Sequence, residues 1–335
     1  MFLGNRYQLQ EPIGRGGLAT VYRGIDTQSN QIVAIKVLRE TYSHDPKFVR
    51  RFQKGVEVMY SLHHPNIVPV YDYGQTDGTY FMVMELIEGT NLQRYLHSEG
   101  LLDAENAVKI AHDVAFGLGA AHRREIVHRA VTPQHILLGD SSIKLTGFSI
   151  ASVYKMSREE QDIEGTSLNI VSYYPPEQAR GEIVTPAADV YSLGAVMYEM
   201  VTGHPPFDGS SPVAVAMQHI QDIPKPSSQF NPTISPALEE IIMRCLEKEP
   251  ERRFRDGSEL ARSLAVLLQA ERVRNTMKPH PSYPCMRVDR WVATLRSTED
   301  VGMETNWHPF QFFIDSVAHS SFFTCDESAG LSKEH

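Results

Sequence analysis

The 335-residue sequence has little cysteine and no long hydrophobic run. Its three cysteines, Cys245, Cys285 and Cys325, are too few and too widely spaced for a disulfide framework, which favours a reducing compartment. No stretch of about 18 apolar residues occurs, and the N-terminus lacks the charged and apolar regions of a signal peptide. These absences argue against a membrane span and predict a cytoplasmic protein.

An excess of positive charge is also lacking. The formal net charge is −9, so nothing suggests a nucleic acid or an anionic membrane as partner. What is present is an ordinary globular composition, with 41% hydrophobic, 22% charged and 9% aromatic residues. These values exclude a disordered or collagen-like chain, and the length is sufficient for one large domain or two lobes.

The first quarter of the sequence alternates strand and turn signals around a single helix. β-Branched runs predict strands over 32–38 and 80–84, and apolar residues at helical spacing predict a helix over 49–59. From residue 100 onward helical periodicity dominates, and the expected helices are 107–121, 190–200 (stopping at Gly203) and 257–273. This order predicts an α+β fold that begins with a small, sheet-rich lobe.

Short motifs in a fixed order run from Tyr7 to about Gln269. They are Gly14–Val21, Val33–Lys36, His64–Val68, His128–Arg129, Pro176–Glu177, Asp189–Gly194, Pro205–Phe207 and Arg253. With these motifs the chain resembles the Hanks-type serine/threonine protein kinases, in particular their bacterial branch. The resemblance implies a bilobal kinase domain over 7–270, with an N-lobe of 7–87 and a C-lobe of 88–270. The tail, 271–335, is expected to be disordered or loosely packed.

Four positions differ from the family's pattern in the motifs that carry its catalytic and magnesium-binding residues. The catalytic aspartate, a lysine and a metal-binding asparagine are replaced by Ala130, Thr132 and His135, and Gly147 replaces the aspartate that holds magnesium. Ala130 has no proton acceptor, and a general base typically contributes about 10²–10⁴-fold. Because Mg²⁺ prefers oxygen ligands, neither His135 nor Gly147 is expected to hold it.

Lys36 matches the lysine that contacts ATP phosphates in the family, but its usual partner is missing. The partner glutamate falls at Gly55, and Glu57 lies about 200° further around the helix, so it faces away. Two interpretations of Lys36 stay open: a phosphate ligand, or a lysine that only extends from a strand towards solvent.

The nucleotide pocket otherwise resembles the family's. Its expected members are Ile13, Gly14, Gly16, Val21, Ala34, Lys36, Met84, Glu85, Leu86 and Leu137. Glycines let backbone N–H groups approach phosphates closely, although Ala19 replaces the third glycine of the loop. No cofactor is certain: ATP stays an open candidate, expected to bind without magnesium.

The residues that hold the family's scaffold together are kept. The resemblance implies structural roles for His128, Phe148, Glu177, Asp189 and Arg253. Breaking a buried ion pair such as the one implied for Glu177 and Arg253 typically costs about 3–5 kcal/mol.

A regulatory hypothesis concerns the segment between 151 and 176. Phosphorylation of Thr166 or Ser167 would let Arg129, which matches a phosphate-contacting arginine of the family, order this segment into a docking surface. The alternative is an ordinary solvated loop.

A kept scaffold around a dismantled site predicts a catalytically inactive pseudokinase, not an enzyme, that binds a protein partner such as an active kinase or its substrate. Two alternatives stay open: a divergent, weakly active ATP-dependent kinase, and a product of gene decay. Histidines and cysteines of the tail fit no zinc pattern, so no metal is expected. Bacterial relatives often continue into a transmembrane segment and this sequence does not, so it is not expected to be a surface receptor.

Overall fold

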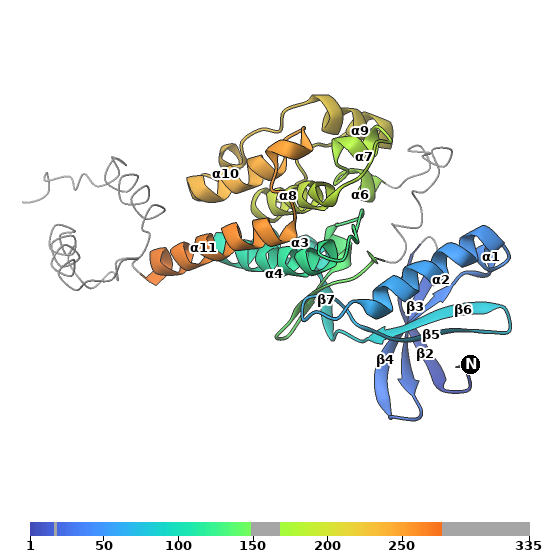
Figure 1. The fold of residues 1–335 in the computed structure, drawn as a ribbon. Coiled ribbons are helices and arrows are strands. Elements are labelled where there is room, and N and C mark those ends of the chain that lie inside the picture. Colours follow the sequence, from blue (N-terminus) through green and yellow to red (C-terminus); the bar gives the residue numbers. More distant parts are fainter. Residues whose placement is uncertain (17–18, 149–167, 277–335) are drawn as a thin grey trace, which may run out of the picture. The chain divides into compact units, whose positions relative to one another are not determined.

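The computed structural model describes residues 1–16, 19–148 and 168–276 (Figure 1). The chain divides into two compact units, 1–277 and 278–335, and the described residues all belong to the first. A lobe built around a β-sheet is followed by a mainly helical lobe, so the predicted α+β fold with a sheet-rich first lobe is confirmed. Most of the 271–335 tail lies outside the described residues.

A six-stranded sheet builds the first lobe. Its strands are β1 (Phe2–Leu3), β2 (Tyr7–Arg15), β3 (Ala19–Asp26), β4 (Gln31–Leu38), β5 (Val70–Thr76) and β6 (Thr79–Glu85). Neighbouring strands pair antiparallel in the order β1-β2-β3-β4-β6-β5. The central strands β4 and β6 coincide with the two predicted strands, because their apolar runs are buried on both faces of the sheet.

Two helices follow β4 along the chain, α1 (Glu40–Ser43) and α2 (Pro46–Ser61). α2 includes the predicted helix 49–59 and begins at a proline, whose fixed φ suits a first helical position. Phe52, Val56 and Met59 are buried on the face of α2 that joins the main core.

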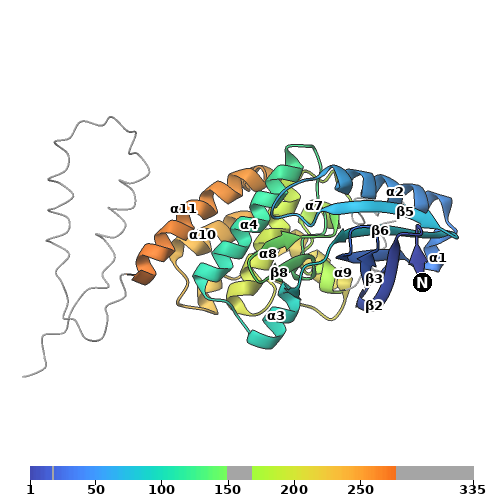
Figure 2. The ribbon, with the colours of Figure 1, turned by 90° about the horizontal axis from the view of Figure 1, so that it is seen from below.

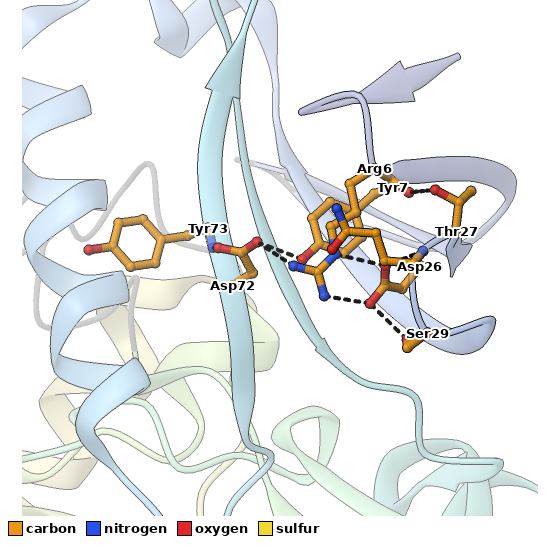
Figure 3. A network of polar contacts seen from close by, with 8 residues as sticks. Arg6, Tyr7, Asp26, Thr27, Ser29, Asp72 and Tyr73 are labelled. Carbon is orange, nitrogen blue, oxygen red and sulfur yellow. Dashed lines mark hydrogen bonds and ion pairs between the residues drawn. The ribbon is translucent and has the colours of Figure 1, made fainter.

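A polar network joins two strands that do not pair with each other (Figure 3). The Tyr7 hydroxyl of β2 donates to the Asp72 carboxylate of β5 over 2.6 Å. Arg6 donates twice, over 2.7 Å, to Asp26 of β3, and its guanidinium also lies 3.8 Å from Asp72. The contact between β2 and β5 shows that the sheet is strongly curled. The hydrogen bonds from Arg6 hold the pKa of Asp26 well below its ordinary value.

The second lobe consists of short strands and helices. Its elements are β7 (Gly89–Asn91), α3 (Leu92–Glu99), α4 (Ala104–His122), η1 (Pro133–His135), β8 (Ile136–Gly139), β9 (Ile143–Leu145), α6 (Leu168–Val171), α7 (Pro176–Ala179), α8 (Pro186–Thr202), α9 (Pro212–Gln221), η2 (Ser227–Gln229), α10 (Pro236–Cys245), η3 (Pro250–Arg252) and α11 (Gly257–Thr276). The predicted helices correspond to α4, α8 and α11. α8 ends where predicted: Gly203 has a left-handed φ of 84°, which glycine adopts without strain.

Helices α4 and α8 form the centre of this lobe, and α11 lies along α4 in both views (Figures 1 and 2). The start of α11 approaches α4 so closely that a Cβ added at Gly119 would lie 2.4 Å from the Ser258 hydroxyl. Across the described ranges, none of the helices has both the length and the apolar character needed to cross a membrane.

Candidate active site

The catalytic loop is anchored by Asp189, near the start of α8. Its buried carboxylate accepts hydrogen bonds of 2.7 Å from the backbone N–H groups of His128 and Arg129, and one of 2.9 Å from His122 Nε2. Burial alone would raise the pKa of Asp189, but the hydrogen bonds, led by that of His122, outweigh it and the pKa lies below its ordinary value. The anchor is a fully satisfied buried charge.

Arg129 turns the chain at this anchor. Its φ of 66° is left-handed, which directs its N–H towards Asp189. Its side-chain Nε atom is buried and has no hydrogen-bond partner among the described residues. Thr166 and Ser167, the expected phosphorylation sites, lie outside the described residues, so the hypothesis of a phosphate contact to Arg129 stays untested.

The rings of His128 and Phe148 pack edge to face with centroids 4.4 Å apart, and both side chains are buried. His128 Nε2 donates to the Thr146 carbonyl over 2.9 Å, while its Nδ1 atom accepts from the Ala130 N–H over 3.2 Å. Burial lowers the pKa of His128, so the ring is neutral. Met59 of α2 belongs to the same core, which therefore runs through both lobes.

Glu177 and Arg253 form a buried, two-pronged ion pair. Arg253 donates to the two carboxylate oxygens of Glu177 over 2.8 and 2.9 Å. The remaining donors of Arg253 reach backbone carbonyls, including that of Ala187 over 3.1 Å. Such a pair, with every donor satisfied, fixes α7 against the loop that precedes α11.

Ala130 stands at the position of the missing base, and Ala130 and Thr132 both contact the ring of His135. The Ala130 carbonyl accepts from His135 Nδ1 over 2.7 Å, and the Thr132 hydroxyl lies 3.2 Å from the same nitrogen. Burial lowers the pKa of His135 to about 3, so its ring is neutral. Because Nδ1 carries the proton, Nε2 is left with a lone pair and acts as an acceptor.

Gly147 faces that ring. Its φ is 100°, a conformation that other residues rarely adopt, and a Cβ built on it would lie 2.7 Å from His135 Cδ2 and 3.0 Å from His135 Nε2. The imidazole therefore fills the volume that a side chain at 147 would need. The family's magnesium ion does not fit these residues, because they offer neither a carboxylate nor an amide oxygen.

Lys36 lies in the middle of β4, opposite Val21 of β3 and Met82 of β6. Burial lowers the pKa of its ammonium group to about 8, and no carboxylate of the described residues pairs with it. Gly55 is buried inside α2 and Glu57 is exposed, so neither offers Lys36 a carboxylate. Within the part of the chain that the structure describes, the lysine is thus a desolvated cation without an ion-pair partner.

The strand register brings together several residues that the sequence predicts to contact adenine. Gly14 pairs with Val21, and Ala34 pairs with Met84 next to the hinge. Val21, Leu86 and Leu137 are partly buried against the same core as Ala34 and Met84. At the loop, the N–H of Gly16 donates to the Ala19 carbonyl, and Ile13 is 39% exposed.

The hinge carries a contact that the sequence did not indicate. Glu85 forms an ion pair of 2.5 Å with Lys144 of β9, so its side chain links the two lobes. A cavity of about 350 Å³ lies beside it, lined by 85–88 and 139–142 together with Ile32. His122, which supports Asp189, was also missed, because nothing in its local sequence marks it as different from other helix-end residues.

The fold and this site together define a two-lobed kinase architecture, and comparison with known proteins identifies the family. The model of the protein kinase domain matches residues 7–262. The chain is 36% identical over 272 residues to the serine/threonine-protein kinase PrkC of Bacillus subtilis, covering 81% of this chain and 42% of that protein. It is 36% identical over 267 residues to PknB of Mycolicibacterium smegmatis, covering 78% of this chain and 43% of PknB. The chain belongs to the protein kinase family and is of the Hanks type found in bacteria.

A third relative is a probable serine/threonine-protein kinase of Clostridium perfringens, 39% identical over 261 residues, with 77% of this chain and 38% of the relative covered. The chain thus spans about two fifths of the length of the curated relatives it matches. Among solved structures, the PknI kinase domain of Mycobacterium tuberculosis is 28% identical with a TM-score of 0.62, covering 78% of this chain and 95% of that one. Rad53 in complex with AMP-PNP, at 23% identity and a TM-score of 0.64, shares the fold; 76% of this chain and 64% of that one are covered.

The prediction that the chain is not an enzyme is contradicted by these relatives. Proteins 35–39% identical over most of the chain are named serine/threonine protein kinases, which points to an enzyme. The prediction rested on four replaced positions and gave them more weight than the similarity of the rest of the domain to active kinases. Those replacements bear on how a phosphoryl group could be transferred, and a lost base or metal ligand lowers a rate without removing a protein from its enzyme family.

Proposed function

We propose that this chain is a divergent member of the bacterial serine/threonine kinase family that signals from the cytoplasm chiefly by binding a partner protein. The partner would be an active kinase or the substrate of one. Phosphoryl transfer by the chain itself would be weak compared with that of relatives that carry both aspartates.

The observation that carries this proposal is the contrast between scaffold and chemistry. Asp189 accepts hydrogen bonds from the backbone N–H groups of His128 and Arg129, and Arg253 donates to both carboxylate oxygens of Glu177. The loop nevertheless presents Ala130 where a base would stand. A catalytic loop that keeps its conformation but lacks a general base is better suited to binding another protein than to rapid phosphoryl transfer.

Nucleotide binding forms part of the proposal. The apolar side chains of Val21, Ala34, Met84 and Leu137, which belong to or pack against one core cluster next to the hinge, support binding of adenine. Lys36 supplies a cation for phosphate, and no metal ion is needed for that contact. ATP would therefore bind as a ligand that stabilises the arrangement of the lobes.

The experiment measures binding and transfer separately. The full chain is titrated with the purified kinase domain of an active bacterial relative, and both the affinity and the rate of the active kinase are recorded. We expect a defined complex that changes that rate, and we expect Phe148→Ala, which removes the ring packed on His128, to weaken it. The binding role would be refuted if the chain bound neither the active kinase nor its substrates and left the rate of that kinase unchanged.

A second candidate, a weakly active kinase, is favoured by the retention of Lys36 and by the names of the relatives. Incorporation of labelled phosphate from ATP should then occur at a rate about 10²–10⁴-fold below that of a relative with an intact base. Lys36→Met should abolish the signal, and Lys109→Met, at an exposed position of α4, should leave it unchanged. Transfer at the rate of the relatives would overturn the proposal that binding is the main function.

A further inference from the structure

The starting point is the contact between His135 and Gly147. The ring of His135 cannot easily turn away, because Nδ1 is held by the Ala130 carbonyl at 2.7 Å and lies 3.2 Å from the Thr132 hydroxyl. The backbone is held as well, since the N–H of Thr146 donates to the His135 carbonyl over 2.9 Å. The two residues form one packed unit in which the imidazole replaces the side chain absent at 147.

The second observation is the charge of the surroundings. None of Ala130, Thr132, His135 and Gly147 carries a carboxylate, and Lys36 is close enough to His135 to influence its protonation. In a site with carboxylates, a divalent cation is needed to bridge them to an anionic phosphate. These four residues therefore offer no negative charge for phosphate to overcome, and neither a carboxylate nor a side-chain amide oxygen for the cation.

We infer that His135 and Gly147 act as one specificity unit, which makes the cleft take the nucleotide phosphate as its metal-free anion in preference to its magnesium complex. The inference rests on the proposed nucleotide binding and adds which ionic form is bound. Free ATP carries more negative charge than its magnesium complex, so Lys36 attracts it more strongly. Bound magnesium, in contrast, would gain no protein ligand from this pair.

The first test compares ATP affinity in EDTA with affinity in excess MgCl2, at matched ionic strength and with the full chain. We expect at least several-fold tighter binding in EDTA, with an active relative as the control that shows the opposite order. Gly147→Asp alone should fail to create magnesium dependence, because the new side chain meets the His135 ring. The double variant His135→Asn with Gly147→Asp removes the ring, adds two oxygen ligands and should reverse the preference.

The second test needs no nucleotide. Gly147→Ala is compared in the natural background and in a His135→Ala background by thermal unfolding. The backbone strain of an alanine at φ 100° is common to both backgrounds, so the difference isolates the contact with the ring. We expect a clearly larger drop in Tm when His135 is present.

The outcomes separate this inference from the proposed function. Equal or tighter binding of the magnesium complex overturns the inference and leaves nucleotide binding intact. No binding in either condition overturns the nucleotide part of the proposed function and with it the preference for one form. Equal Tm losses in the two backgrounds overturn the packed unit itself.

Discussion

His122 Nε2 lies 2.9 Å from the Oδ2 atom of Asp189, and both side chains are buried. The other ring nitrogen of His122 accepts from the N–H of Gly257 over 3.0 Å. One imidazole therefore connects the end of α4 with the anchor of the catalytic loop and with the start of α11.

We predict that His122→Phe destabilises the protein by about 1–3 kcal/mol, because it leaves a buried carboxylate and a buried N–H short of a partner. The measurement is urea unfolding at neutral pH. His112→Phe on the same helix is the matched control, since His112 is partly exposed and its ring nitrogen contacts the neighbouring Asp113 rather than a distant segment. Equal losses from the two variants would show that the contact to Asp189 contributes nothing.

The buried ion pair of Glu177 and Arg253 should contribute more to the free energy of unfolding than the exposed ion pairs do. Glu177→Gln is expected to cost about 3–5 kcal/mol, because it leaves an uncompensated guanidinium in the interior. Glu182→Gln removes the partner of Arg180 in an exposed pair at 3.9 Å and should cost less than about 1 kcal/mol. Unfolding in urea distinguishes the two, and a small loss from Glu177→Gln would be the contrary result.

Lys36 should be a net cost to folding at neutral pH. Its pKa is about 8 in the folded protein, below that of an unfolded lysine, so the charged form is disfavoured by folding. The penalty is complete below pH 8 and disappears as the pH rises towards the unfolded pKa of about 10.4. Lys36→Met should therefore stabilise the protein on the order of 1–3 kcal/mol at pH 7.

This advantage of Lys36→Met should shrink between pH 8 and pH 10, as measured by urea unfolding at each pH. Lys109→Met, at an exposed site, is expected to change neither the stability nor its pH dependence. A loss of stability from Lys36→Met at pH 7 would mean that the ammonium group has a favourable partner.

The polar network of the first lobe predicts sensitivity to acid (Figure 3). Because hydrogen bonds from Arg6 lower the pKa of Asp26 in the folded protein, its contribution is present above the unfolded pKa and is lost as the pH falls below about 4. Asp26→Asn should lower Tm by several degrees at pH 7 and by much less at pH 3. A constant difference in Tm across this range would contradict the prediction.

The elements whose pattern is local could be predicted from the sequence. The strands β4 and β6, the helices α4, α8 and α11, and the stop at Gly203 all follow from apolar periodicity and from one glycine. The motifs that led to the kinase family are also short and continuous.

Contacts between distant segments could not be predicted. Nothing near Tyr7 indicates that its hydroxyl meets Asp72, and nothing near His135 indicates that its ring fills the space at Gly147. The sequence showed that oxygen ligands were missing at 135 and 147, but only the fold shows that one replacement occupies the volume of the other. The same limit explains the wrong prediction about enzyme class, which depended on single positions.

The contact between His135 and Gly147 also has a consequence for the evolution of these two positions. A mutation that restores an aspartate at 147 would create a clash while the imidazole is present, and one that restores an asparagine at 135 would leave a gap beside a glycine. Either single step would lower stability before any ligand set is regained. Two coupled changes, one at each position, would therefore be needed to place oxygen ligands at both 135 and 147 without a clash or a gap.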